Sequence, residues 1–250
     1  MGLNFCAFAN VFKGIIKMNT KNGIFLTQDI SKNPIILEWE EISGQTEQLS
    51  EKIKDIAAIL VSAYTKTEVD FACKKPESVS SDFMLKSLAP ILSQDIHKVD
   101  WGQFEAKTKN LLEQFFATTD WAKYSNAQDV NIFVIAIDQT TGDRLGVIQF
   151  LISPDFGPHN VKAALYGVAP FAQSRNLEYL LMSSIFKLKP DIKRVFLHTR
   201  STNTDAISNY KDWGFTEFAG KLPNWTDLEY LTEHSNKLQK TSDSLVIQNN

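Results

Sequence analysis

Short, mostly apolar segments recur along the chain and are typical of β-strands, and residues 35–42 also alternate between apolar and polar positions, as a strand with one buried face does. We expect strands over residues 35–42, 131–138, 144–152, 161–168, 195–199 and 225–231, and a short one that begins at Phe215. Thr140 to Asp143 joins two of these strands, and Gly142 in that turn permits the positive φ that a tight hairpin requires. The pattern therefore predicts a sheet that includes a hairpin.

Other segments place apolar residues three and four positions apart, which predicts amphipathic helices between the strands. We expect these helices over residues 46–64, 81–92, 101–118 and 173–189, and from Thr202 to Gly214. Pro90 disturbs the second helix, whereas Asp100 with Gln103 resembles a capping box at the start of the third.

The elements follow the order β-α-(helices)-β-β-β-α-β-α-β-β, without an internal repeat. A chain of 250 residues is long for one compact domain and short for two, so we expect one domain with additions. We predict an α/β (α+β) fold in which residues 35–232 form the main domain, with a helical insertion at about 66–128. Residues 1–34 are expected to be an N-terminal extension, and residues 233–250, which are rich in Lys, Gln, Ser and Asn, a flexible tail.

Composition narrows the classes of partner. The formal net charge is −3 and the sequence pI about 5.8, and no dense stripe of Lys and Arg appears, so we expect no nucleic-acid partner. Cys6 and Cys73 are too few for a disulfide framework, and the four histidines lack the spacing of metal ligands. These features predict a cytoplasmic protein without a metal.

The first 17 residues are apolar, but they are too short to cross a bilayer and lack the basic start of a signal peptide. The beginning MGLNFC resembles a myristoylation signal, except that Cys6 stands where Ser or Thr is required. We therefore interpret these residues as an extra segment in front of the domain, or as an early start of the chain before Met18. We expect no membrane association.

The segment from Val195 to Phe218 carries the most chemistry. Asn203 and Tyr210 lie two helical turns apart and therefore point to the same side, as residues that line a cleft would. The pattern Asn203-x-x-Ala206-x-x-x-Tyr210-x-x-x-Gly214-Phe215 resembles the last core motif of the GNAT (GCN5-related) N-acetyltransferases. This resemblance implies a mixed, mostly antiparallel sheet of about six to seven strands flanked by helices, with acetyl-CoA as cosubstrate and Tyr210 as the general acid.

The same resemblance implies where CoA would bind. Its pantetheine arm would lie between strands 161–168 and 195–199, against the backbone of Gly167 and Val168. Its diphosphate would be held by the following loop, at Gln173, Ser174, Arg175, Asn176 and Leu177, and Asn203 would contact CoA from the next helix.

This loop departs from the family's Gln/Arg-x-x-Gly-x-Gly/Ala pattern, because it keeps Gln173 and loses both glycines. Asn176 is tolerable, since Asn adopts left-handed conformations more readily than most residues. Glu178 places an anionic side chain where a diphosphate should approach, and two unit charges about 4 Å apart at an effective dielectric near 20 repel by roughly 4 kcal/mol.

Each candidate also has a purely structural interpretation. Arg175 could contact phosphate or be a solvated loop arginine, Ser174 could bind phosphate or cap a helix, and Asn203 could contact CoA or cap a helix. Tyr210 could act as an acid or only pack in the core.

The sequence names neither a general base nor an acceptor. Asp155, His159 and His198 are available, but a structural or solvent-facing role is favoured for each. Five aromatic residues could line an acceptor pocket or simply fill the core: Trp101, Phe104, Phe115, Phe116 and Trp121.

Three functions remain open. The first is acetyl transfer from acetyl-CoA to an amine of a small molecule or a protein. The second is a GNAT-like binding module whose site is catalytically impaired, and the third is an acyltransferase that uses another CoA thioester.

Overall fold

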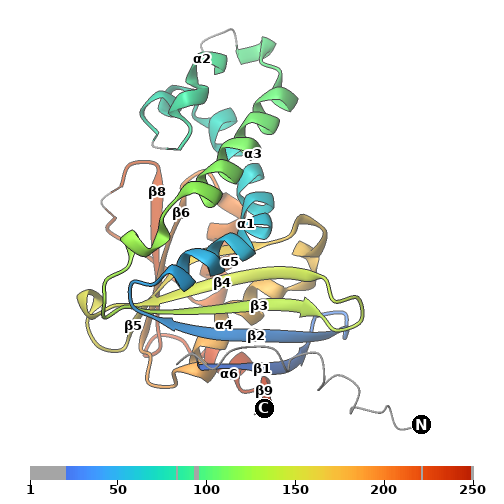
Figure 1. Cartoon of the computed structure of the whole chain (residues 1–250), viewed down its shortest axis with the longest axis vertical. Helices are drawn as coiled ribbons and strands as arrows, with labels where there is room; N and C mark the ends of the chain where they lie inside the picture. The colour runs from blue at the N-terminus through green and yellow to red at the C-terminus, as the bar shows by residue number, and fades with distance from the viewer. Residues whose placement is uncertain (1–20, 83, 93–95, 221, 249–250) are drawn as a thin grey trace.

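The computed structural model describes residues 21–82, 84–92, 96–220 and 222–248, which fold around one large sheet (Figure 1). Within these residues the sheet has nine strands in the spatial order β7-β8-β6-β5-β4-β3-β2-β1-β9. The strands are β1 (Lys21–Gln28), β2 (Pro34–Ser43), β3 (Val130–Asp138), β4 (Arg144–Ile152), β5 (Asn160–Val168), β6 (Arg194–Arg200), β7 (Thr216–Phe218), β8 (Trp225–Leu231) and β9 (Val246–Gln248). Neighbours are antiparallel except β5 and β6, which are parallel. The predicted mixed, mostly antiparallel sheet is confirmed, and β1 and β9 extend it beyond the expected six to seven strands.

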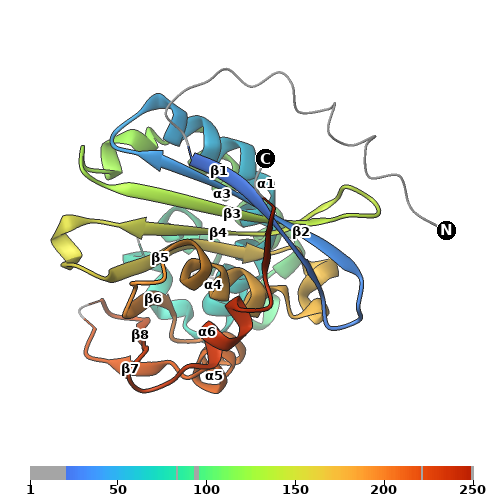
Figure 2. The same cartoon turned by 90° about the horizontal axis from the view of Figure 1, so that it is seen from below.

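Helices cover both faces of this sheet (Figure 2). The helices are α1 (Glu47–Lys74), α2 (Ala89–Leu92), α3 (Trp101–Thr118), α4 (Leu177–Leu188), α5 (Thr204–Trp213) and α6 (Lys237–Ser242). Apolar residues of α1 and α3 share one core with the sheet, whereas those of α4, α5 and α6 share the core on the opposite face. In the part of the chain that is described, no helix is long and apolar enough to cross a bilayer.

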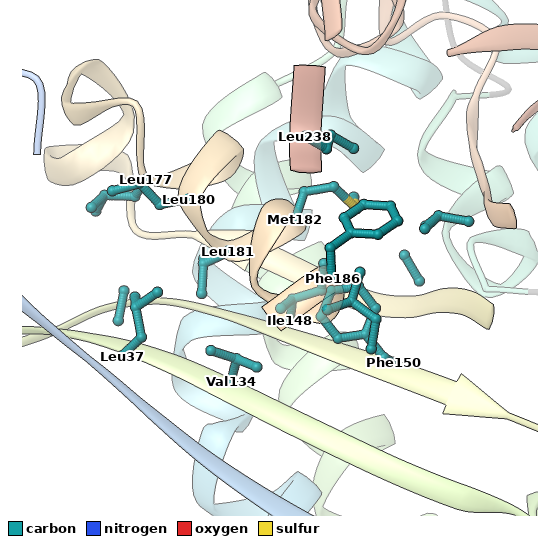
Figure 3. Packing of buried hydrophobic residues seen from close by; sticks show 14 of the residues in the cluster. Leu37, Val134, Ile148, Phe150, Leu177, Leu180, Leu181, Met182, Phe186 and Leu238 are labelled. Carbon is teal, nitrogen blue, oxygen red and sulfur yellow. The ribbon is translucent and has the colours of Figure 1, made fainter. Parts of the chain in front are cut away.

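Side chains alternate between the two faces along each strand, and this alternation builds the two cores. In β3, Val134 belongs to the core under α4, whereas Phe133 and Ile135 belong to the core under α1. Figure 3 shows α4 between the sheet and α6, with Met182 of α4 near Leu238 of α6.

The helical insertion lies between α1 and β3, as expected, and projects from the sheet with α2 at its far end (Figure 1). α1 continues to Lys74 instead of ending at Tyr64, because its buried stripe extends through Glu68 and Phe71 until Pro76 follows the helix. Phe71 also begins a separate apolar cluster inside the insertion.

The helix expected over 81–92 is instead a series of short turns, at Pro76–Ser81, Lys86–Leu88 and α2. The Asp82 carboxylate accepts the backbone N–H groups of Met84 and Leu85, and this local bonding competes with a continuous helix. The helix over 101–118 has the predicted bounds, and the Asp100 side chain caps it by accepting the Gln103 N–H.

Both ends of the described chain differ from expectation. Residues 21–28 of the expected extension form β1, which pairs with β2 along its whole length. Residues 233–250 were expected to be flexible, but they include α6 and β9; Leu238 and Leu245 are buried, and β9 pairs with β1. The polar composition of residues 233–250 gave no indication that Leu238 and Leu245 are buried. The predictions for residues 1–17, including Cys6, lie outside the described residues.

Candidate active site

The strands β5 and β6 separate soon after they begin to pair. Within the described residues their parallel pairing covers Asn160↔Arg194, Val161↔Val195 and Lys162↔Phe196. We call the region beyond these pairs, between residues 163–168 and residues 197–200, the β5–β6 gap. The gap lies between the two strands where the GNAT resemblance places the pantetheine arm of CoA.

A β-bulge explains the separation. Along β4, Gln149 pairs with Leu165 but the next residue, Phe150, pairs with Ala163, which leaves Ala164 as an extra residue in β5. A bulge bends its strand and increases the local twist. β5 therefore turns away from β6 at the point where their pairing stops.

Tyr210 lies on α5 beside this gap. It is 5% exposed, and its ring contacts those of Tyr166, Trp213 and Phe215. Burial raises the pKa of its phenol above the ordinary value, and the nearby Tyr64 and Glu178 raise that pKa further. The phenol is therefore protonated at neutral pH, as a general acid must be, while the ring also packs in the core.

Tyr64 reaches the gap from α1. Its hydroxyl oxygen accepts the backbone N–H of Tyr166 in β5 at 3.0 Å, and burial raises the pKa of Tyr64 to about 12. A backbone donor at this edge of β5 thus already has a partner within the chain.

Gly167 and Val168 are the residues expected to contact the pantetheine arm. Gly167 packs against α1, and Val168 pairs with β4. A Cβ atom at position 167 would lie 2.8 Å from the Ala63 Cβ, so glycine here allows α1 to pack closely on the strand. Val168 is buried and pairs with Gly146 of β4. Backbone contact with a ligand from these two residues stays a prediction.

The helix at the expected diphosphate loop begins at Leu177 instead of at residue 173, the start predicted from the sequence. Pro170–Arg175 form a 3₁₀ turn, Asn176 adopts the left-handed conformation with φ 57°, and α4 begins only at Leu177. Gln173 and Ser174 are exposed on the turn, and Asn176 rather than Ser174 occupies the N-cap position, so the capping interpretation of Ser174 is wrong. Leu177 is buried in the core under α4.

Arg175 is neither solvated nor free for an anion. Its Nε donates to Asp29 at 2.5 Å and its Nη1 to Asp138 at 2.8 Å, while Nη2 is buried without a hydrogen-bond partner among the described residues. Burial alone would raise the pKa of both carboxyls, but hydrogen bonds, including those from Arg175, hold each pKa below its ordinary value. Arg175 therefore joins the loop to the β1–β2 and β3–β4 turns.

Glu178 occupies the first turn of α4. Burial raises the pKa of its carboxyl, and a hydrogen bond from its own backbone N–H lowers that pKa in part. The carboxylate thus lies where the helix N-terminus would otherwise attract an external anion.

Asn203 does not cap α5 with its side chain, although it stands at the N-cap position. Its Nδ2 instead donates to Thr199 Oγ1 at 3.4 Å, at the end of β6. The capping interpretation of Asn203 is therefore wrong, and the contact with CoA stays a prediction.

The three residues considered as bases have different surroundings. Asp155 accepts a hydrogen bond from Asn126 at the surface, and His159 contacts the exposed Asp191 at 3.2 Å. His198 Nδ1 lies 2.5 Å from Asp227 Oδ1, and Asp227 belongs to the adjacent strand β8. No sequence signal indicates this last pair, because it depends on the register between β6 and β8.

The aromatic residues of the insertion belong to its packing. Phe104 and Phe116 are fully buried, and Phe115, Phe116 and Trp121 contact one another through their rings. The core interpretation therefore holds for these residues. Within the described ranges, no group of three His, Cys, Asp or Glu side chains is arranged to hold a metal ion.

The mostly antiparallel sheet, with its parallel strands that diverge beside a tyrosine-bearing helix, is a GNAT-like fold. No family model and no curated protein sequence matches the chain.

Several solved acetyltransferase structures resemble it. The PaiA N-acetyltransferase from Thermoplasma acidophilum in complex with coenzyme A is 13% identical with a TM-score of 0.45, covering 78% of this chain and 98% of that one. Ard1 from Thermoplasma volcanium is 22% identical with a TM-score of 0.35, covering 40% and 69%. Nourseothricin acetyltransferase is 18% identical with a TM-score of 0.34; the match covers 40% of this chain and 65% of that protein's length.

Proposed function

We propose that this protein transfers an acetyl group from acetyl-CoA to the amine of a small molecule or a protein. The observation that carries the proposal is the β5–β6 gap with the buried, protonated Tyr210 beside it. An open strand edge can bind an extended ligand arm through backbone hydrogen bonds. A protonated phenol next to that arm can supply a proton to its sulfur.

The reaction is a direct transfer. The amine nitrogen attacks the thioester carbonyl, a C–N bond forms, and the C–S bond breaks. Tyr210 donates its phenolic proton to the departing thiolate, which lowers the cost of separating that charge in a buried site.

The donor site fits acetyl-CoA at one end better than at the other. The gap suits the pantetheine arm, provided that Tyr64 releases the Tyr166 N–H. At the diphosphate end, Glu178 lies at the start of α4 and Arg175 is engaged by two carboxylates. Binding therefore requires Glu178 to turn away from the helix start.

These obstructions favour a second candidate, a GNAT-like module whose catalysis is impaired. In that case Asp29 and Asp138 keep Arg175 in a structural role and Glu178 permanently replaces the external anion. A donor other than acetyl-CoA is the third candidate, since the described residues fix the acyl group poorly.

Calorimetric titration of the full chain with CoA and acetyl-CoA separates these candidates. The enzyme should bind both, and millimolar acetyl-CoA should raise the melting temperature, because a ligand that binds only the folded state stabilises it. Absence of binding and of any thermal shift would contradict the proposal. A thermal-shift comparison of several CoA thioesters identifies the preferred acyl group.

Glu178→Gly is the matched variant. If Glu178 obstructs the diphosphate, this change should strengthen CoA binding by tenfold or more, since about 1.4 kcal/mol corresponds to tenfold in affinity. The binding-module candidate predicts that Glu178→Gly creates neither CoA binding nor turnover.

A further inference from the structure

A small cavity of about 200 Å³ lies at the point where β5 and β6 separate. It is lined by Lys162, Ala163, Ala164, His198, Leu222 and Trp225. Lys162 belongs to the last parallel pair, and Ala164 is the bulged residue. The cavity therefore adjoins the beginning of the β5–β6 gap.

The His198 side chain lies on the face of the sheet opposite Tyr210. Along β6, Val195 and Leu197 point into the core that contains Tyr210 and α4, so His198 points to the other face, on which α1 lies. His198 and Tyr210 therefore approach the gap from opposite sides. This placement allows one group to serve the incoming amine and the other the leaving thiolate.

His198 is held by a buried carboxylate. Its Nδ1 lies 2.5 Å from Asp227 Oδ1, and the side chains of His198 and Asp227 are 27% and 8% exposed. Because a carboxylate accepts the proton on Nδ1, the neutral ring carries its free lone pair on Nε2. His198 is one of the residues that line the cavity.

A close backbone contact fixes Asp227 in turn. A Cβ atom at position 220 would lie 2.2 Å from Asp227 Oδ2 and 2.7 Å from its Cγ, so a larger residue there would displace the carboxylate. The carboxylate is confined between Gly220 and His198. Lys162 of β5 is the nearby cation, and Asp227 partly offsets the lowering of its pKa by burial.

We propose that His198 is the general base of the acetyl transfer and that Asp227 is its positioning residue. His198 Nε2 removes a proton from the attacking amine as the C–N bond forms, and Tyr210 protonates the thiolate as the C–S bond breaks. His198 then releases its proton to water, and water returns a proton to Tyr210. This inference rests on the proposed function. The cavity volume of about 200 Å³ suits the reacting end of a small amine.

The test uses the full chain with acetyl-CoA and three probe amines, ethylamine, ethanolamine and benzylamine, and measures the CoA thiol released. Binding of acetyl-CoA to each variant is measured separately by calorimetry. His198→Ala should lower turnover by roughly 100-fold or more, the usual contribution of a general base, and leave acetyl-CoA binding unchanged. Asp227→Asn should also lower turnover, because an amide can donate to Nδ1 and favour the wrong tautomer.

Chemical rescue distinguishes a base from a structural residue. Imidazole added to His198→Ala should restore turnover, whereas pyrazole, which has the same shape but is far less basic, should not. His159→Asn is the matched control: it removes the other described histidine–aspartate contact, His159 with Asp191, outside the cavity, and should leave turnover unchanged. Asn tolerates the positive φ of position 159.

The outcomes separate the two proposals. If wild-type protein fails to bind acetyl-CoA, the proposed function is wrong and the base assignment falls with it. If acetyl-CoA binds but no probe amine reacts, the transfer to small amines and the base assignment are both wrong. If the wild type transfers the acetyl group and His198→Ala is fully active, the base assignment alone is wrong. Equal rescue by pyrazole would also contradict it. Should His198→Ala not fold, His198→Gln, checked by its melting temperature, replaces it in the rate comparison, with Asp227→Asn as the second variant.

Discussion

At the scale of single residues, the β5–β6 gap brings together groups whose pKa values are raised by burial. Burial therefore suppresses their ionisation. Tyr210 and Tyr64 are kept protonated, and Glu178 has a raised pKa although it lies in the first turn of α4. Such perturbation is common in functional sites, because catalysis needs pKa values that differ from those in water. Under the proposed function, the phenol of Tyr210 donates a proton and Glu178 faces the diphosphate.

Tyr210→Phe tests the first of these roles. The ring that packs against Trp213 and Phe215 remains, so the fold and the affinity for acetyl-CoA should be unchanged. Turnover of a reactive probe amine should fall by about 100-fold, because the proton donor is lost.

Tyr230→Phe is the control for Tyr210→Phe. Tyr230 is also buried, but its hydroxyl is hydrogen-bonded to the Ser235 carbonyl and to the Gln239 side chain of α6. That variant should lose stability and keep its turnover. Unchanged turnover in Tyr210→Phe would assign Tyr210 to packing alone.

At the scale of elements, one buried arginine connects the helical insertion to the sheet. Arg200, at the end of β6, bonds Glu68 of α1 with Nε and Nη2, and Asp82 of the insertion with Nη1 at 2.7 Å. Its guanidinium also lies over the rings of Phe71 and Trp225. The insertion is thereby held at the end of β6, next to the cavity and the loop that leads to α5.

Arg200→Met should lower the free energy of unfolding by about 3–5 kcal/mol, because it leaves two carboxylates without their partner in a buried setting. Urea denaturation measures this change. Arg144→Met is the matched control, since Arg144 pairs with Asp55 at 2.8 Å at the surface, where such a pair contributes about 0–1 kcal/mol. Equal losses in the two variants would show that the contacts of Arg200 add nothing beyond a surface pair.

At the scale of the whole molecule, both ends of the described chain complete the sheet and one of its cores. β9 pairs with β1 and β1 with β2, so the two ends meet at one edge of the sheet (Figure 2). Leu238 of α6 is fully buried in the core under α4. Residues 237–248 are therefore part of the folded unit.

Leu238→Ala should lower the free energy of unfolding by about 2–5 kcal/mol, the range for removing a buried leucine side chain and leaving a cavity. The control is Ile30→Ala, at a residue that is 66% exposed, and it should change stability by less than about 0.5 kcal/mol. Denaturant titration measures both. A negligible loss for Leu238→Ala would restore the interpretation of this segment as a tail.

Local features of the fold could be predicted from the sequence because they depend on neighbours in the chain. The helix over 101–118 begins at the Asp100 cap, and the β3–β4 turn places Gly142 at φ 80°. Gly214 likewise adopts φ 103° after α5, as a helix-ending glycine does. The predicted end of α1 was wrong because distant contacts decide it. The helix continues past Tyr64 and includes Glu68, whose partner is Arg200.

The sequence by itself determined the class of fold, because strand and helix periodicities are local properties, and the resemblance of the motif from Asn203 to Phe215 implied that Tyr210 is an acid. Only the tertiary structure decided the partners of the charged candidates. Arg175 meets Asp29 and Asp138, and His198 meets Asp227, through residues that are far apart in the chain. The physical reason is that sheet register and packing bring these pairs together, and neither leaves a signal in the local pattern of residues.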